Sequence, residues 1–239
     1  MNDHLQTLEL HLKDFACLDP DKIKSNYHYL ELLLQANQRS NLTSITGWEE
    51  AVIKHLYDSL MLTEFADLSK TEQILDLGSG AGLPGIPLAL AYPEQKVYLL
   101  EASKKKAEFL ELAINKLNLA NTLVLNERAE NLAHHAGHRG MYDLVVARAV
   151  AELAVLLELA APFCRKDGIF IAYKGPHFSS ELNEAERALH LLGMEIDHIT
   201  HYDLPLMMGA RTLLIFRKTT ETPPQYPRRP GIPEKRPLR

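Results

Sequence analysis

One stretch decides the fold of this chain: Ile74-Leu75-Asp76-Leu77-Gly78-Ser79-Gly80-Ala81-Gly82-Leu83-Pro84-Gly85. A short apolar run ends at an acid, opens into glycines and leads into a second apolar segment, 86–91. That order predicts a strand, a tight turn and the start of a helix. Glycine tolerates positive φ and lets a ligand approach the backbone, and a helix N-terminus offers free N–H groups. The turn is therefore suited to hold a small molecule.

The acids around this turn indicate which molecule it holds. A glycine turn of this kind often binds a dinucleotide, whose pyrophosphate lies on the helix dipole. Asp76 stands two residues before the first glycine, where a carboxylate would repel a pyrophosphate but suit the ammonium and sulfonium of S-adenosylmethionine. Glu101 ends the next apolar run, and an acid there commonly accepts hydrogen bonds from ribose hydroxyls. We expect S-adenosylmethionine as cofactor; a nicotinamide cofactor and a purely structural turn are the alternatives.

The composition is that of an ordinary globular protein. The 239 residues are 46% hydrophobic and 24% charged, enough for one core and a small accessory subdomain. No apolar run approaches a membrane span, and the first residues lack a signal sequence. The two cysteines, Cys17 and Cys164, form neither a disulfide framework nor a metal-binding spacing, so we expect a cytoplasmic protein. The net charge of −5 means that a polyanion would have to bind local patches.

Residues 1–70 are predicted to form an N-terminal helical subdomain. Asp19-Pro20 is a helix start signal, and Thr46-Gly47-Trp48-Glu49 resembles a capping box that opens a later helix. On that later helix His55, Asp58 and Ser59 share one face. A polar helix face is the plain interpretation of these three residues; their position just before the ligand-binding strand favours a functional one.

Residues 71–218 alternate between strand and helix patterns. Further strands are expected near 97–100, 123–125, 142–146, 169–173, 195–200 and 212–217, and a single helix over 181–192. Such alternation predicts a doubly wound, mostly parallel seven-stranded sheet of the Rossmann-like α/β class. Ligands on such a sheet bind outside the carboxyl ends of its strands. The polar residues expected at these ends are Asp76, Glu101, Glu130, Arg148 and Lys174.

Two other features carry less weight. His134, His135 and His138 lie in a loop-like region without accompanying acids or cysteines, so no metal site is expected. Residues 219–239 contain six prolines and five basic residues, which predicts an extended basic tail. That tail is either disordered or a clamp on phosphate.

The residues that are missing narrow the acceptor. The fourth strand does not end in Asn-Pro-Pro-Tyr, the element expected for methylating an exocyclic base amine. Neither cysteine follows that strand, which argues against covalent attack on a pyrimidine. Lys174 would serve as a base for a ribose hydroxyl, but Arg148 stands where an acid is expected. A ring nitrogen with a free lone pair, such as guanine N7, needs no base. A ribose or small-molecule acceptor remains the alternative.

Several motifs together resemble those of one family. They are Asn37-x-x-x-Asn41-Leu42-Thr43, His55-x-x-Asp58-Ser59-Leu60, the glycine turn, Arg128-Ala129-Glu130, Tyr142-Asp143-x-x-x-x-Arg148-Ala149, Tyr173-Lys174-Gly175 and Tyr226-Pro227-Arg228-Arg229-Pro230-Gly231-x-Pro233. With them the chain resembles, over nearly its whole length, the RsmG family (glucose-inhibited division protein B). These are guanine-N7 methyltransferases of small-subunit ribosomal RNA.

The resemblance implies a substrate, partners and site residues. The substrate would be a guanine near the decoding site of 16S RNA, presented as naked RNA or in the 30S subunit to a monomeric enzyme without metal. Residues that would face the RNA are Asn41, His55, Asp58, Arg148 and Lys174. Residues expected at the donor, from the resemblance and the strand-end pattern together, are Asp76, Gly78, Gly80, Gly82, Leu83, Glu101, Ala129, Glu130 and Arg148.

Overall fold

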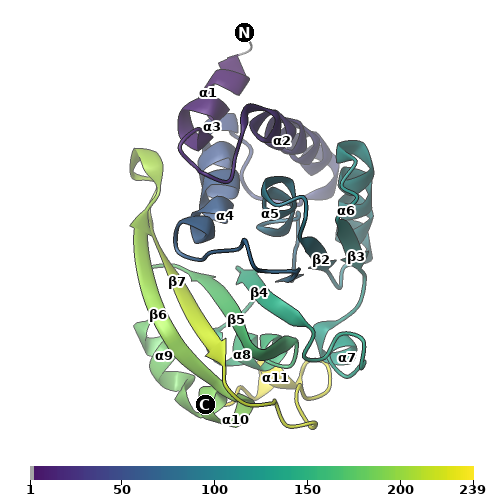
Figure 1. Cartoon of the computed structure of the whole chain (residues 1–239), viewed down its shortest axis with the longest axis vertical. Helices are drawn as coiled ribbons and strands as arrows, with labels where there is room; N and C mark the ends of the chain where they lie inside the picture. Colours follow the sequence, from purple (N-terminus) through teal and green to yellow (C-terminus); the bar gives the residue numbers. More distant parts are fainter. Residues whose placement is uncertain (1–2) are drawn as a thin grey trace.

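A computed structural model describes residues 3–239, which form a seven-stranded sheet with helices on both faces (Figure 1). The strands are β1 (Gln73–Leu77), β2 (Lys96–Leu100), β3 (Thr122–Leu125), β4 (Tyr142–Arg148), β5 (Cys164–Lys174), β6 (Met194–Asp203) and β7 (Ala210–Lys218). Their order is β3-β2-β1-β4-β5-β7-β6; β1 to β5 are parallel, and β7 is antiparallel to both neighbours. The predicted doubly wound, mostly parallel sheet is confirmed.

The two faces of the sheet bury two separate hydrophobic cores. Successive side chains of a strand point to opposite faces, and β4 shows this directly. Leu144 and Val146 pack into the core under the N-terminal helices, whereas Val145 and Ala147 pack into the core around α8. Because both faces are buried, the central strands are apolar at nearly every position.

The helices divide between these faces in chain order (Figure 1). The first face carries α1 (Asp3–Leu12), α2 (Pro20–Ser40), α3 (Trp48–Ala51), the π-helical turn η1 (Val52–Tyr57), α4 (Asp58–Leu60), the 3-10 turn η2 (Met61–Glu64), α5 (Gly85–Ala91) and α6 (Lys104–Leu117). The second carries α7 (Ala129–Leu132), α8 (Leu153–Ala160), α9 (Ser179–Glu184), α10 (Glu186–Leu192) and α11 (Ile232–Lys235). A 3-10 turn, η3 (Pro205–Met207), joins β6 to β7.

One predicted helix start is confirmed, whereas another helix start and the extent of one helix are wrong. Asp19 caps α2 as predicted, its carboxylate accepting from the Lys22 N–H at 2.9 Å. The prediction of a capping box at residues 46–49 is wrong, because Gly47 is the N-cap of α3 and provides no side-chain hydrogen bond. The single helix predicted over 181–192 is two helices that meet at Ala185, where φ is −90° and ψ is 0°.

The glycine turn lies where the strand order reverses. β1 is hydrogen-bonded to β2 on one side and to β4 on the other, so the turn leaves the sheet at its topological switch point. The N–H groups of Gly78 and Ser79 donate to Leu100 O, and the buried Tyr29 hydroxyl of α2 donates to Ala81 O at 2.7 Å. The N-terminal helices therefore hold the turn in place.

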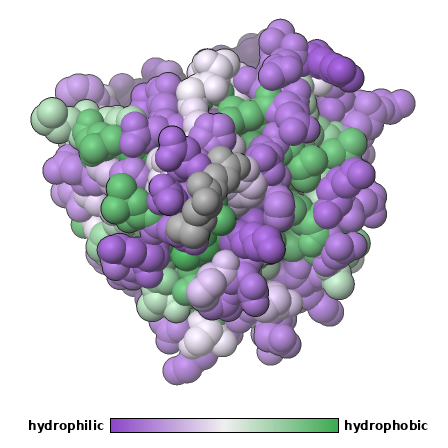
Figure 2. All heavy atoms as spheres, turned by 90° about the horizontal axis from the view of Figure 1, so that it is seen from above, coloured by the Kyte–Doolittle hydropathy of each residue, from purple (hydrophilic) through white to green (hydrophobic). Residues whose placement is uncertain are grey.

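The surface over the N-terminal helices is mostly polar. Seen from above, hydrophilic residues dominate this face and hydrophobic ones form separate patches (Figure 2). Within residues 3–239, none of the helices has the length and apolar character needed to cross a membrane.

Residues 219–239 are folded against the second face of the sheet. Arg228 makes a bidentate ion pair with the fully buried Glu158 of α8, with Nη2 2.6 Å from Oε2 and Nε 2.9 Å from Oε1. Arg139 donates to the Tyr226 and Thr222 carbonyls at 2.9 and 2.8 Å, respectively. The tail is therefore neither free nor extended, and Arg228 is occupied within the protein.

Arg228→Met is expected to destabilise the fold by about 3 kcal/mol, because it leaves the buried Glu158 carboxylate without its counter-ion. Arg239→Met removes exposed ion pairs of the same tail, to Glu152 and Glu184, and should destabilise the fold far less, because water screens exposed charges. Urea unfolding of both variants measures the difference. Equal losses would show that the buried pair does not fasten the tail.

Candidate active site

Two cavities open at the carboxyl edge of the sheet. The larger, about 430 Å³, is lined by Thr43, Ser44, Ile45, Lys54, His55, Asp58, Arg148, Ala149, Val150, Ala151, Leu156, Tyr173, Lys174, Gly175 and Arg211. The smaller, about 150 Å³, is lined by Leu77, Gly78, Leu100, Glu101, Ala102, Glu127, Arg128, Ala129, Glu130, Val150, Leu159 and Glu234. Val150, just after β4, lines both and lies between them. The larger contains most of the residues expected to face RNA and is named the acceptor cavity; the smaller contains residues expected at the methyl donor and is named the donor cavity.

The turn that borders the donor cavity places the backbone of Gly78 directly in the cavity wall. Gly78 has φ +73°, and a Cβ there would lie 2.8 Å from Cγ2 of Val150. A side chain at this position would therefore be strained and would also collide with the residue between the cavities. Glycine at position 78 therefore leaves the end of β1 open to the approach of a ligand.

Glu101 is held in place by the backbone of the site. Its Oε2 accepts from the Gly80 N–H at 2.9 Å, and its Oε1 accepts from the Ser103 N–H at 2.7 Å. Each oxygen has a second lone pair, so the carboxylate retains acceptor capacity in the cavity that it lines. Its orientation is fixed before any ligand binds, which fits recognition of a pair of ribose hydroxyls.

Asp76 lies behind the turn and lines neither cavity. Its Oδ2 accepts from the Gly85 N–H at 3.0 Å at the start of α5, and its Oδ1 has no partner within residues 3–239. Burial raises the pKa of this carboxyl to about 7. The sequence placed Asp76 at the mouth of the site, but the structure places it underneath, because its side chain turns toward the core and not along the strand.

The other residues expected at the donor form two groups: some line the donor cavity, and the rest lie outside its lining. Ala129 and Glu130 line the donor cavity at the end of β3. Gly80, Gly82 and Leu83 are absent from its lining, and Arg148 lines the acceptor cavity instead. Gly80 acts through its N–H to Glu101. A Cβ on Gly82 would lie 2.5 Å from Ile86 Cδ1, so this glycine serves close packing.

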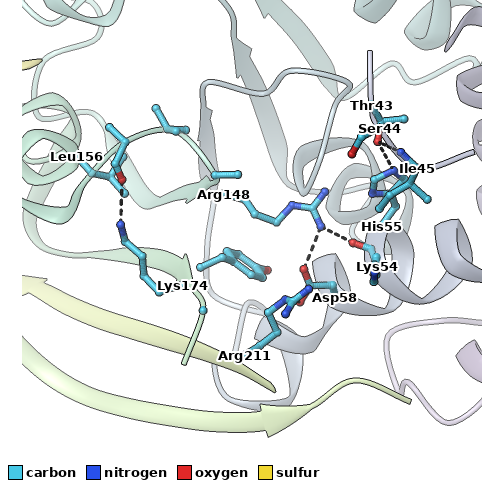
Figure 3. A pocket seen from close by; sticks show the side chains of 15 residues that line it. Thr43, Ser44, Ile45, Lys54, His55, Asp58, Arg148, Leu156, Lys174 and Arg211 are labelled. Atoms are coloured by element: carbon cyan, nitrogen blue, oxygen red, sulfur yellow. Dashed lines mark hydrogen bonds and ion pairs between the residues drawn. The ribbon is translucent and has the colours of Figure 1, made fainter. Parts of the chain in front are cut away.

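The acceptor cavity centres on the buried carboxylate of Asp58 (Figure 3). Its Oδ2 accepts from Arg148 Nη1 at 3.2 Å, and its Oδ1 accepts from the Tyr202 hydroxyl at 2.7 Å. Arg211 Nε lies 3.7 Å from the same Oδ1. Arg148 also donates to Lys54 O at 2.9 Å. Two guanidiniums thus share one carboxylate, which leaves a net positive charge in the cavity.

His55 is neutral and structural in character. It is 5% exposed, and its Nε2 lies 3.0 Å from Thr43 Oγ1. Burial and the nearby charge of Arg148 lower its pKa to about 3. His55 and Asp58 do share the face predicted for them, with η1 carrying His55; a π-helical turn often occurs at a functional site.

The other two expected RNA-facing residues have different positions. Lys174, at the end of β5, lines the acceptor cavity on the side away from Asp58 (Figure 3). Its Nζ donates to Glu181 Oε2 at 2.6 Å and to Ala151 O at 2.9 Å. Asn41 lies outside the lining of either cavity. It ends α2 with φ +47°, its N–H donating to Asn37 O.

Several residues of this site were missed by sequence reasoning, and four of them shape the acceptor side. Tyr202 and Arg211 come from the two antiparallel strands, where a rule based on parallel strand ends assigns no position. Thr43 was quoted only within a motif, and Val150 only follows the expected Arg148-Ala149. The positive φ of Ala149, +56°, has no sequence signal because alanine rarely adopts it.

Across residues 3–239, no group of three or more His, Cys, Asp or Glu side chains is arranged to hold a metal ion. The loop histidines have separate partners. His134 Nε2 lies 2.8 Å from Pro227 O, and His138 Nδ1 lies 2.6 Å from the Tyr142 hydroxyl. His134 therefore contacts the C-terminal tail, and His138 contacts Tyr142 of β4.

The fold and the two cavities define the class: a Rossmann-like methyltransferase fold. A SAM-dependent methyltransferase from Aquifex aeolicus aligns with TM-score 0.54 and 16% identity, over 80% of this chain and 98% of that one. A SAM-dependent O-methyltransferase from Thermotoga maritima aligns with TM-score 0.55 and 15% identity, over 80% and 72%. At these identities the likeness concerns the fold.

Sequence similarity then gives the family. The model of the family GidB, rRNA small subunit methyltransferase G, matches residues 22–207. Ribosomal RNA small subunit methyltransferase G of Carboxydothermus hydrogenoformans is 44% identical, covering 97% of this chain and 100% of its own length. The protein of that name from Listeria monocytogenes is 38% identical over 92% and 93%. The chain belongs to the rRNA small subunit methyltransferase G family, as the motifs indicated.

His55→Gln is expected to make the fold less sensitive to acid. The pKa of His55 is about 3 in the folded chain and 6.5 ordinarily, so below pH 6.5 only the unfolded chain takes up this proton. Stability is therefore lost as the pH falls toward 3, by about 1.4 kcal/mol per pH unit. Glutamine removes this loss and retains a partner for Thr43. Urea unfolding between about pH 6 and pH 4 measures both slopes.

The exposed His177 provides a matched control for this experiment, as His177→Gln. Parallel curves for His55→Gln and the unsubstituted protein would contradict a buried neutral imidazole at position 55.

Proposed function

We propose that this protein transfers a methyl group from S-adenosylmethionine to N7 of a guanine in 16S ribosomal RNA. Family membership supports the rRNA substrate, and the paired cavities provide one place for the donor and one for a base. The observation that carries the choice of N7 is the state of the candidate bases in the acceptor cavity, Asp58, His55 and Lys174, which already contact other groups of the protein.

The candidate bases of this cavity, Asp58, His55 and Lys174, each contact other groups of the protein. Both oxygens of Asp58 accept from neighbouring side chains, and His55 Nε2 is paired with Thr43 Oγ1. Lys174 Nζ donates to Glu181 Oε2 at 2.6 Å and to Ala151 O at 2.9 Å. An exocyclic amine or a ribose hydroxyl must lose a proton when it is methylated, whereas N7 attacks with its own lone pair. The cavity therefore suits N7.

Donor binding would use the residues around the smaller cavity. Gly78 would admit the methionine part, Glu101 would accept from the ribose hydroxyls, and Ala129 and Glu130 would border the adenine. Asp76, Gly80, Gly82 and Leu83 would act by holding the turn. When bound, S-adenosylmethionine supplies a methyl carbon that its sulfonium makes electrophilic.

On the acceptor side, the protein would act mainly by positioning the guanine and the RNA phosphates. The N7–CH₃ bond forms as the C–S bond breaks, so the protein must align guanine with the donor in a site shielded from water. Arg148 would donate to O6, beside N7, while Arg211 and Lys174 would contact phosphates. Asn41, exposed at the end of α2, would contact RNA outside the cavity. Val150 marks the passage through which the methyl group would cross.

The partner would be 16S RNA or the 30S subunit, and the protein would act in the cytoplasm as a monomer without metal. The domain division at residues 70 and 218 belongs to the same proposal. Methyl transfer from labelled S-adenosylmethionine to deproteinised 16S RNA and to 30S particles, both from cells lacking this protein, tests the function. Label at a single guanine N7 would support it. Label in neither RNA, with donor still bound, would overturn the ribosomal assignment.

Arg211→Met is expected to weaken RNA binding about three- to tenfold and to lower the slope of log affinity against log salt concentration by about one, as for loss of one phosphate contact. Donor affinity should not change, because Arg211 lines only the acceptor cavity. Arg217→Met on the same strand is the matched control, since Arg217 pairs with Asp197 away from both cavities. Identical salt slopes for the two variants would remove Arg211 from the RNA site.

A further inference from the structure

The C-terminal segment reaches the donor cavity. Glu234 of α11 lines that cavity together with Glu101, Ala129 and Glu130, although 104 residues separate it from Glu130 in the sequence (234 minus 130). Gly231, with φ +78°, begins this helix, and its N–H donates to Glu130 Oε1 at 3.1 Å. The tail is thus bonded to a residue of the cavity wall.

This position is fixed from two sides. Arg228 is anchored to the buried Glu158 three residues before Gly231, and Pro233 and Leu238 are buried beyond it. Leu238 packs in the hydrophobic core around α8. The segment therefore forms a fixed part of the donor cavity wall, and Glu234 is presented by backbone that is held in place.

The carboxylates of the donor cavity differ in what they already bind. Glu130 accepts from Arg128 Nη2 at 2.8 Å and Arg128 Nε at 3.3 Å, besides Gly231. Glu127 Oε1 accepts from the Arg128 N–H at 2.8 Å and from Asn131 at 2.9 Å. Within residues 3–239, no hydrogen bond or ion pair engages the carboxylate of Glu234.

The direction of the bound donor follows from the rest of the cavity. This step rests on the proposed function. With the methionine part at Gly78 and the ribose hydroxyls at Glu101, the adenine must extend toward the end of β3, where Ala129 and Glu234 lie. Its exocyclic amino group needs a hydrogen-bond acceptor there, and a carboxylate is a strong one.

We propose that Glu234 is a specificity-determining residue of the donor site, its carboxylate accepting a hydrogen bond from the exocyclic amino group of the donor's adenine. The C-terminal segment is then the wall that selects an adenine nucleoside. A nucleoside with a carbonyl oxygen at the same position would place that oxygen against the carboxylate and would be rejected.

The test compares two ligands that differ at this group and at the adjacent ring nitrogen N1, which carries a hydrogen only in the inosyl compound. S-adenosylhomocysteine carries the amino group, and S-inosylhomocysteine carries a carbonyl oxygen in its place; isothermal titration gives both affinities. We expect the unsubstituted protein to prefer the adenosyl compound at least about tenfold, as for one hydrogen bond to a charged group. Glu234→Gln should abolish most of this preference, because an amide both accepts and donates.

Two matched variants make the result specific. Glu221→Gln changes another acid of the same tail, one that borders a different cavity, and should keep the full preference. Glu127→Gln changes the other candidate acceptor in the donor cavity and should also keep it. Preference retained in Glu234→Gln, or lost in Glu127→Gln instead, would overturn the role of Glu234.

The same experiment separates this inference from the function on which it rests. If the unsubstituted protein binds S-adenosylhomocysteine but does not discriminate against the inosyl compound, the role of Glu234 falls while donor binding stands. If it binds neither compound, the methyl-donor assignment falls, and the role of Glu234 falls with it.

Discussion

The buried carboxylate of Asp58 is the point on which the acceptor side of the molecule depends. It lies on the segment that follows η1, and it is bound by Arg148 from β4, Tyr202 from β6 and Arg211 near the start of β7. These elements are 90, 144 and 153 residues away in sequence (148, 202 and 211 minus 58). A buried charge without such partners would cost several kcal/mol by rough estimate, so the N-terminal helices and the far edge of the sheet must meet here.

This constraint also determines where the two cavities lie. Arg148 ends β4, and the next residues turn sharply, with Ala149 at positive φ, so that Val150 comes to rest over Gly78. At the end of β4, Arg148 thus provides a positive charge to the acceptor cavity, and Val150 separates the two cavities. Because β1 and β4 are neighbours at the switch point, the two cavities are adjacent as a consequence of the topology.

The sequence predicted what local patterns encode. The strand, the glycine turn and the acid expected at the ribose are contiguous or one strand apart, and Gly78 and Glu101 line the same cavity. What it could not predict depends on long-range geometry. The position of Asp76 beneath the turn follows from the direction of its side chain at the end of β1. The folded tail depends on the ion pair between Arg228 and Glu158, which are 70 residues apart in the sequence. Composition alone predicts an extended basic segment there.

The charge of the acceptor cavity fits the course of the proposed reaction. Before transfer, O6 and the flanking phosphates of the RNA are attractive partners for Arg148 and Arg211, which share the single carboxylate of Asp58. Methylation of N7 places a positive charge on the guanine ring. The same two guanidiniums then repel the modified base, and a nearby charge of the same sign in a partly buried site is felt more strongly than in water. The arrangement that binds the substrate would thus also favour release of the product.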